Sequence, residues 1–185
     1  MIGRRVLPVA ALAYLLVMYL VGAPPRQQQF VAFEAAGVLA VTPEHVRAVI
    51  LESGARRYTL RRSAGGWTDG ENSLDANLRA ELERGLKYLH TARPVRDIEQ
   101  PALAGTAREP FGLAPPWLTL TVELDDASEL RLEFGAPNND DTLDYVHVAS
   151  RGQLVLTSRF FATQWRTVQE MLQTSSTDHL HVRQP

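Results

Sequence analysis

The chain has 185 residues, a formal net charge of −2 at neutral pH and no cysteine. This length accommodates one ordinary domain with a sizeable core in addition to a membrane segment. The absence of cysteine excludes disulfides, thiolate metal sites, a cysteine nucleophile and a lipidated cysteine. A slightly acidic chain also argues against nucleic acid as a partner, because nucleic-acid binding needs a basic surface.

The N-terminus carries the clearest localisation signal. Two arginines, Arg4 and Arg5, precede an uncharged apolar run from Val6 to Ala23. A helix over this run would be about 27 Å long, which is enough to span a thin bilayer. We therefore predict that residues 1–23 form a single transmembrane anchor in contact with membrane lipid.

A cleaved signal peptide is the alternative interpretation, because the run ends in the small-residue sequence Val21-Gly22-Ala23. The two prolines that follow disfavour cleavage, since proline just after the scissile bond fits signal peptidase poorly. Arginines before the run orient the N-terminus toward the cytoplasm. The expected location is the inner (cytoplasmic) membrane, with a single pass and a periplasmic domain.

Residues 24–29, PPRQQQ, are predicted to be a short tether, and residues 30–173 an extracytoplasmic domain. The domain is expected to begin with a strand hairpin. An apolar run from Val46 to Leu51, a turn at Ser53-Gly54 and a second run around Tyr58 indicate two antiparallel strands before Trp67.

A helix is expected next, from about Leu74 to His90. Five leucines recur there at helical spacing: Leu74, Leu78, Leu82, Leu86 and Leu89. They place one apolar stripe along a helix that Asn72, Ser73 or Asp75 would cap. Such a stripe beside strands predicts packing on the sheet.

The segment REPFGLAPPWLTLTVEL predicts an elbow that leads into a strand. Gly112 permits a turn, Pro115-Pro116 favours extended backbone, and Phe111, Leu113 and Trp117 are expected to fill the helix–sheet junction. The alternation of Leu118 to Leu124 predicts a strand with one solvated side.

Three further strands and a second helix are expected after the elbow. Turn residues at DDAS, APNNDD and SRG separate strands of a β-meander. Phe161, Trp165, Val168 and Leu172 keep helical spacing after Ser158, which predicts a C-terminal helix, and residues 174–185 are expected to form a flexible tail. The predicted fold class is α+β, with a single transmembrane helix followed by an antiparallel sheet and two packed helices.

The chain shows, in this order, the Gly65-Gly66-Trp67 hairpin end, the following helix, the Phe111-Gly112-Leu113-x-x-Pro116 elbow, Phe134-Gly135 and Tyr145-Val146. This order of parts resembles the domain-of-unknown-function family 4340 over roughly Val46 to Trp165. The resemblance implies a membrane-anchored extracytoplasmic module, found in many members beside ABC-type export or gliding-motility components. It implies no catalytic residues.

The rest of the sequence contains one weak indication of a metal site. Asp140, Asp141, Asp144 and His147 have side chains that suit Ca²⁺ or a harder transition metal, but the order of an EF-hand loop is missing. The preferred interpretation is a solvated hairpin loop. We predict no catalytic residue, no cofactor and no metal site.

Five residues are candidates for partner contact. Tyr14 lies near the middle of the apolar run, where its hydroxyl would need a hydrogen-bond partner, and Ala10, Ala11 and Ala13 would let another helix approach closely. Arg57 and Arg61 belong to the one basic cluster of the domain, which could bind lipid headgroups or an acidic partner. The selected candidates are Ala10, Ala13, Tyr14, Arg57 and Arg61.

Three functions remain open at this point. The preferred one is a non-enzymatic accessory or assembly subunit of a bacterial-type inner-membrane protein complex. The second is an extracytoplasmic solute- or glycan-binding module associated with an ABC-type export system, which would need exposed aromatic residues such as Trp67 or Trp117. The third is a metal-dependent hydrolase, which would need the Asp/His cluster to converge.

Overall fold

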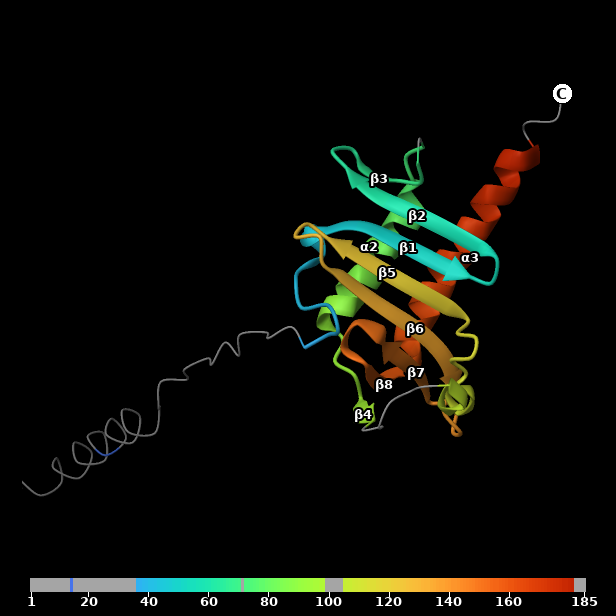
Figure 1. Ribbon diagram of the computed structural model, residues 1–185. Coiled ribbons are helices and arrows are strands. Elements are labelled where there is room, and N and C mark those ends of the chain that lie inside the picture. Colours follow the sequence, from blue (N-terminus) through green and yellow to red (C-terminus); the bar gives the residue numbers. More distant parts are fainter. Residues whose placement is uncertain (1–13, 15–35, 71, 99–104, 182–185) are drawn as a thin grey trace, which may run out of the picture. The chain divides into compact units, whose positions relative to one another are not determined.

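The computed structural model describes residue 14 and residues 36–70, 72–98 and 105–181 (Figure 1). The chain divides into two compact units, Met1–Glu34 and Ala35–Pro185. Of the predicted anchor, only Tyr14 is described, and it is helical; the rest of the anchor and the tether lie outside the described residues. Within the described ranges, the structure contains no helix with the length and apolar character needed to cross a membrane.

The second unit is built on one antiparallel sheet of eight strands. The spatial order is β3-β2-β1-β5-β6-β7-β8-β4, so the two short strands β3 and β4 form opposite edges. The strands are β1 (Val46–Ser53), β2 (Arg56–Ser63), β3 (Gly66–Thr68), β4 (Arg96–Ile98), β5 (Leu118–Leu124), β6 (Glu129–Pro137), β7 (Leu143–Val148) and β8 (Gln153–Ser158).

Two helices, α2 (Ala76–Thr91) and α3 (Arg159–His181), lie behind the sheet in the view of Figure 1. Three short 3-10 helices connect the other elements: η1 (Pro43–His45), η2 (Gly105–Phe111) and η3 (Ala149–Arg151). The predicted α+β class with an antiparallel sheet and two helices is therefore confirmed for this unit. The strand β4 was not predicted, because its three residues are too few to show the alternation of a strand.

The core lies between the helices and one face of the sheet. Leu118, Leu120 and Val122 of β5 are fully buried on this side, which we call the helix-covered face. Their cross-strand partners on β6 are Phe134, Leu132 and Leu130, which are also buried. Strand alternation sends Thr119, Thr121 and Glu123 to the other side, which we call the open face.

Helix α2 is capped at its N-terminus by Asp75, one of the three residues predicted as caps. The carboxylate of Asp75 accepts hydrogen bonds from the backbone N–H groups of Asn77 and Leu78, at 2.8 and 3.1 Å. All five leucines of the predicted stripe are buried. Gly85 on the same helix lets α3 approach closely, because a Cβ at this position would lie 3.1 Å from the ring of Trp165.

The C-terminal helix is longer than the sequence indicated. It starts directly after Ser158, as predicted, but its helical backbone continues to His181. The segment predicted as a flexible tail from residue 174 is therefore helical as far as His181, and residues 182–185 lie outside the described part. The buried side chains of α3 are the ones expected from its spacing: Phe161, Trp165, Val168 and Leu172.

Candidate functional site: the open face of the sheet

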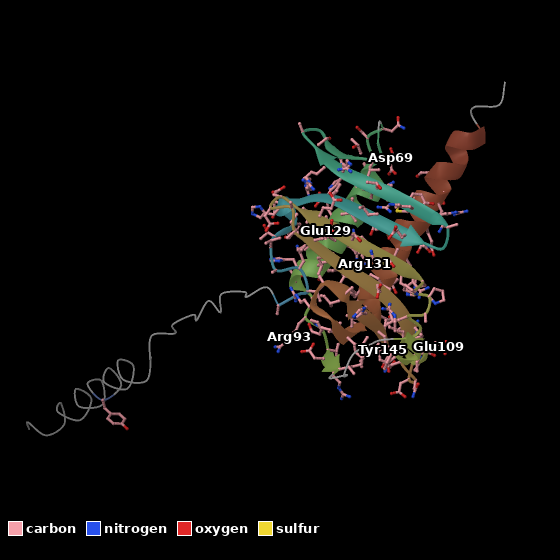
Figure 2. The ribbon with its side chains drawn as sticks, in the orientation of Figure 1. Asp69, Arg93, Glu109, Glu129, Arg131 and Tyr145 are labelled. Atoms are coloured by element: carbon pink, nitrogen blue, oxygen red, sulfur yellow. The ribbon has the colours of Figure 1, made fainter. Side chains whose placement is uncertain are left out.

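The open face of the sheet is the main surface that the helices leave uncovered. Cross-strand register places three rows of side chains on it: Arg61, Ala48, Glu123 and Glu129; Thr59, Ile50, Thr121 and Arg131; and Arg57, Glu52, Thr119, Glu133 and His147. Figure 2 shows Glu129 and Arg131 on this side of β6. The surface is therefore polar and charged rather than apolar.

Several charged side chains of this surface form ion pairs with one another. Arg57 lies 3.0 Å from Glu52, and Arg47 lies 3.1 Å from Glu123. These pairs flank a row of smaller side chains, of which Ile50 and Thr121 are only 8% and 7% exposed. The result is a patch in which the uncharged side chains of Thr59, Ile50 and Thr121 lie between charged rows, with Arg131 at the end of their own row.

A buried polar cluster anchors one end of the open face. The Oε2 atom of Glu133 on β6 accepts hydrogen bonds from the guanidinium of Arg108 and from Nδ1 of His147, the latter at 2.8 Å. The Glu133 side chain is 12% exposed and that of His147 is 11% exposed. We call these three residues the Glu133 cluster.

The charge of this cluster follows from its hydrogen bonds. Burial alone would raise the pKa of Glu133, but the hydrogen bonds from His147 and Arg108 outweigh it and hold the pKa below its ordinary value. Since an ionised carboxylate can only accept, Nδ1 of His147 carries the proton in this contact. Glu133 is thus a stable, partnered carboxylate at neutral pH.

The Glu133 cluster holds the elbow against the sheet. Arg108 of η2 also donates from Nε to the carbonyl of Leu113, at 3.3 Å. The ring of Phe111 packs edge-on against Tyr145 of β7, with centroids 4.9 Å apart. Carboxylate-oriented histidines also occur in catalytic sites, but here both ends of the cluster bond to the elbow and the sheet, so its arrangement serves to position the backbone.

Two glycines make this contact possible. Gly112 has a φ of +65°, and a Cβ there would lie 2.5 Å from the backbone nitrogen of Ala136. A Cβ on Gly135 would collide with the carbonyl oxygen of Phe111. The predicted role of Gly112 is confirmed. Of the three residues expected at the helix–sheet junction, only Trp117 lies there, because Phe111 and Leu113 pack over Gly135 and Tyr145 of the sheet instead.

The acidic loop before β7 does not form one cluster. Asp144 and His147 are three positions apart on a strand, so their side chains point to opposite faces. Asp144 is 3% exposed on the helix-covered face, whereas we expected a solvated loop residue. Among the described residues, no group of three histidine or acidic side chains is close enough to hold a metal ion.

The aromatic residues required for a glycan site are engaged inside the domain. Trp67 is 1% exposed and donates from Nε1 to Glu83 at 2.6 Å, while Arg62 stacks on its ring. Trp117 is half-buried beneath the guanidinium of Arg166, which lies 4.1 Å from the ring centroid. Neither ring is available as a flat platform for a sugar.

The predicted partner-contact residues fall into two groups. Arg57 and Arg61 lie on the open face, two rungs apart on β2, and both are exposed. Arg57 is engaged with Glu52, and Arg61 makes no ion pair with any described residue. Tyr14 is 64% exposed in the first unit, and Ala10 and Ala13 lie outside the described residues.

Sequence reasoning missed the Glu133 cluster. Glu133 occupies an ordinary outward-facing position in the alternation of β6, opposite His147 of β7, so the pattern of β6 alone did not single it out. Arg108 could not be connected to it from spacing. No family model, curated protein or solved structure shows significant similarity to this chain, so the resemblance to family 4340 stays a prediction.

Proposed function

We propose that the protein is a non-enzymatic, membrane-anchored accessory or assembly subunit of a bacterial-type inner-membrane complex, with its folded domain in the periplasm. The apolar run from Val6 to Ala23 supplies the anchor in this proposal. The observation that carries the subunit role is the open face. It is a polar surface on an antiparallel sheet, on which several charges are held in ion pairs while Arg61 is exposed and makes none with any described residue.

The chemistry of this surface suits a protein partner. Protein interfaces have a less charged centre inside a polar rim, with arginine frequently among the residues that contribute most to binding. On the open face, Ile50 and Thr121 form such a centre between charged pairs. Arg61 would then pair with an acidic side chain of another subunit.

The test is site-specific photo-crosslinking of the full chain in native membranes. A photo-reactive amino acid at Thr59, on the open face, is expected to give one discrete adduct with an integral membrane protein. The same group at Glu170, which is exposed on α3, serves as the control. The Thr59 adduct should disappear with Arg61→Glu, because the new charge would repel an acidic partner.

Arg56→Glu is the matched control, since Arg56 is exposed on the same strand but alternates to the other side. Loss of the adduct in both variants would show a general charge effect. An adduct from Glu170 but not from Thr59 would place the partner on the helical side. A protein that remains a lone monomer in native membranes would refute the subunit proposal.

A further inference from the structure

One end of the domain exposes apolar side chains that the core does not use. Val95 is 59% exposed and Phe160 is 77% exposed, and they are the only large apolar side chains with such exposure among the described residues of the second unit. Both lie at the β4 edge: the N–H of Val95 bonds to the carbonyl of Leu156 at 2.8 Å, and Phe160 follows β8 in the first turn of α3. They share one edge of the fold.

An open groove of about 200 Å³ lies beside them. It is lined by Tyr88, Ala92, Ser158, Phe160 and Phe161. Its walls are mainly rings and aliphatic atoms from the end of α2 and the start of α3. A groove with this lining can accept an apolar chain or a ring but offers few hydrogen-bonding groups.

Basic side chains lie close to this apolar surface, although the register turns Arg96 toward the open-face side of the edge, opposite Leu156, and Val95 toward the helix side. Arg93 and Arg96 are exposed and make no ion pair with any described residue, and Lys87 is exposed on the last turns of α2. Asp97 is the one acidic residue of strand β4, which contains Arg96. We call Arg93, Val95, Arg96, Phe160 and the groove beside them the entry patch.

The described part of the domain begins beside Arg93 of this patch. One groove, near the start of β8 and thus at the opposite end of that strand from Ser158, is lined by Ala36, Gly37, Val38, Arg93, Pro94, Asp97, Arg151 and Gln153. The N–H of Gly37 bonds to the carbonyl of His90 at 3.0 Å, which fixes the start of the domain to the end of α2. Figure 2 shows Arg93 close to this start.

The chain between the predicted anchor and Ala36 is short. About a dozen residues, 24–35, separate Ala23 from Ala36, and a fully extended chain of that length reaches at most about 40 Å. In the proposed arrangement this tether joins the anchor to the domain at its first described residues, beside Arg93.

We propose that the entry patch binds the surface of an anionic bilayer. Phe160 and Val95 would enter the interfacial region, while Arg93 and Arg96 would pair with lipid phosphates. Exposed apolar side chains beside arginines are the combination that binds such interfaces, and each basic residue contributes about a fivefold preference for anionic lipid. This inference rests on the proposed anchor and adds a second contact, made by the domain itself.

The absence of cysteine allows a direct test, because a single introduced cysteine labels at one position. Full-length protein with Ser158→Cys carries an environment-sensitive fluorophore beside Phe160. The control is Ala64→Cys, in the exposed turn before β3 at the opposite edge. Both are reconstituted into vesicles of phosphatidylcholine alone or with phosphatidylglycerol, containing lipids with a nitroxide on the headgroup.

The Ser158→Cys label should be quenched at least severalfold more than the Ala64→Cys label, and more with phosphatidylglycerol. Arg93→Gln combined with Arg96→Gln should remove the lipid-charge dependence, and Phe160→Ser should reduce quenching in both vesicles. Arg56→Gln, far from the patch, should change neither result. Circular dichroism of each variant checks that the fold is retained.

Two measurements separate this inference from the proposed anchor. Resistance to alkaline extraction tests the anchor, whereas quenching tests the patch. Equal quenching of both labels in a chain that resists extraction would overturn the membrane contact and leave the anchor intact. Protection of the Ser158→Cys label from aqueous iodide in detergent without anionic lipid would show that a protein segment fills the groove, and would also overturn the membrane contact.

Discussion

Replacing Glu133 by glutamine tests the electrostatic role of the cluster that holds the elbow. The amide keeps the size of the side chain but removes the charge that Arg108 and His147 share. Hydrogen bonds to a charged group contribute about 1.5–3 kcal/mol each. Because both bonds end on the same oxygen and Arg108 is partly exposed, we expect a combined loss of about 2–3 kcal/mol in the free energy of unfolding.

The measurement is thermal unfolding of the full chain in mild detergent, followed by circular dichroism. For a domain of this size, that loss lowers the unfolding temperature by roughly 4–12 °C. Glu129→Gln is the matched control, since Glu129 lies on the same strand and face but is exposed. It should change the stability by no more than about 0.5 kcal/mol.

The effect should also depend on pH. The pKa of Glu133 is lowered in the folded domain from the ordinary 4.5, so its carboxylate stabilises the fold fully above about pH 4.5. The difference between the native chain and Glu133→Gln should shrink as the pH falls below that value through the folded pKa. Equal destabilisation by the two substitutions, or a difference that persists unchanged at low pH, would refute the assigned role.

Three other substitutions test local features by the same unfolding assay. Gly112→Ala should destabilise the domain by more than Gly152→Ala, because both have φ near +60° but only Gly112 faces a neighbouring backbone; equal losses would show that crowding at Ala136 is unimportant. Asp75→Ala should cost about 1 kcal/mol through loss of the N-cap while Asp75→Asn costs little, and equal costs would contradict capping. Burial raises the pKa of Asp144 above 3.8, so its charge opposes folding as the pH rises; Asp144→Asn should therefore be neutral or stabilising at pH 7, with the gain disappearing near pH 4, and a destabilised variant at pH 7 would contradict this.

Local sequence patterns predicted the elements that the core needs. The leucine stripe of α2 and the alternation of β5 each repeat with the period of their element, so the buried side could be read from the sequence. The same alternation could also have separated Asp144 from His147, because positions three apart on a strand face opposite sides. A strand was expected here, but its start was placed after Asp144; the separation required recognising that β7 begins at Leu143.

Contacts between segments far apart in the sequence could not be predicted from local patterns. Nothing in the local pattern pairs β1 with β5 or places β4 beside β8, since both contacts depend on how the chain returns after α2 and η2. The cluster of Arg108, Glu133 and His147 has the same origin. Its residues come from three elements, and only the final register brings their polar atoms together.

The strand order has a consequence for how the domain folds. Strands β1 to β3 form local hairpins that can close within microseconds, but the other edge of β1 pairs with β5, which is synthesised much later. Until β5 arrives, β1 presents a free edge with a run of aliphatic side chains from Val49 to Leu51. We therefore expect nascent chains that end before Leu118 to be prone to edge-to-edge aggregation.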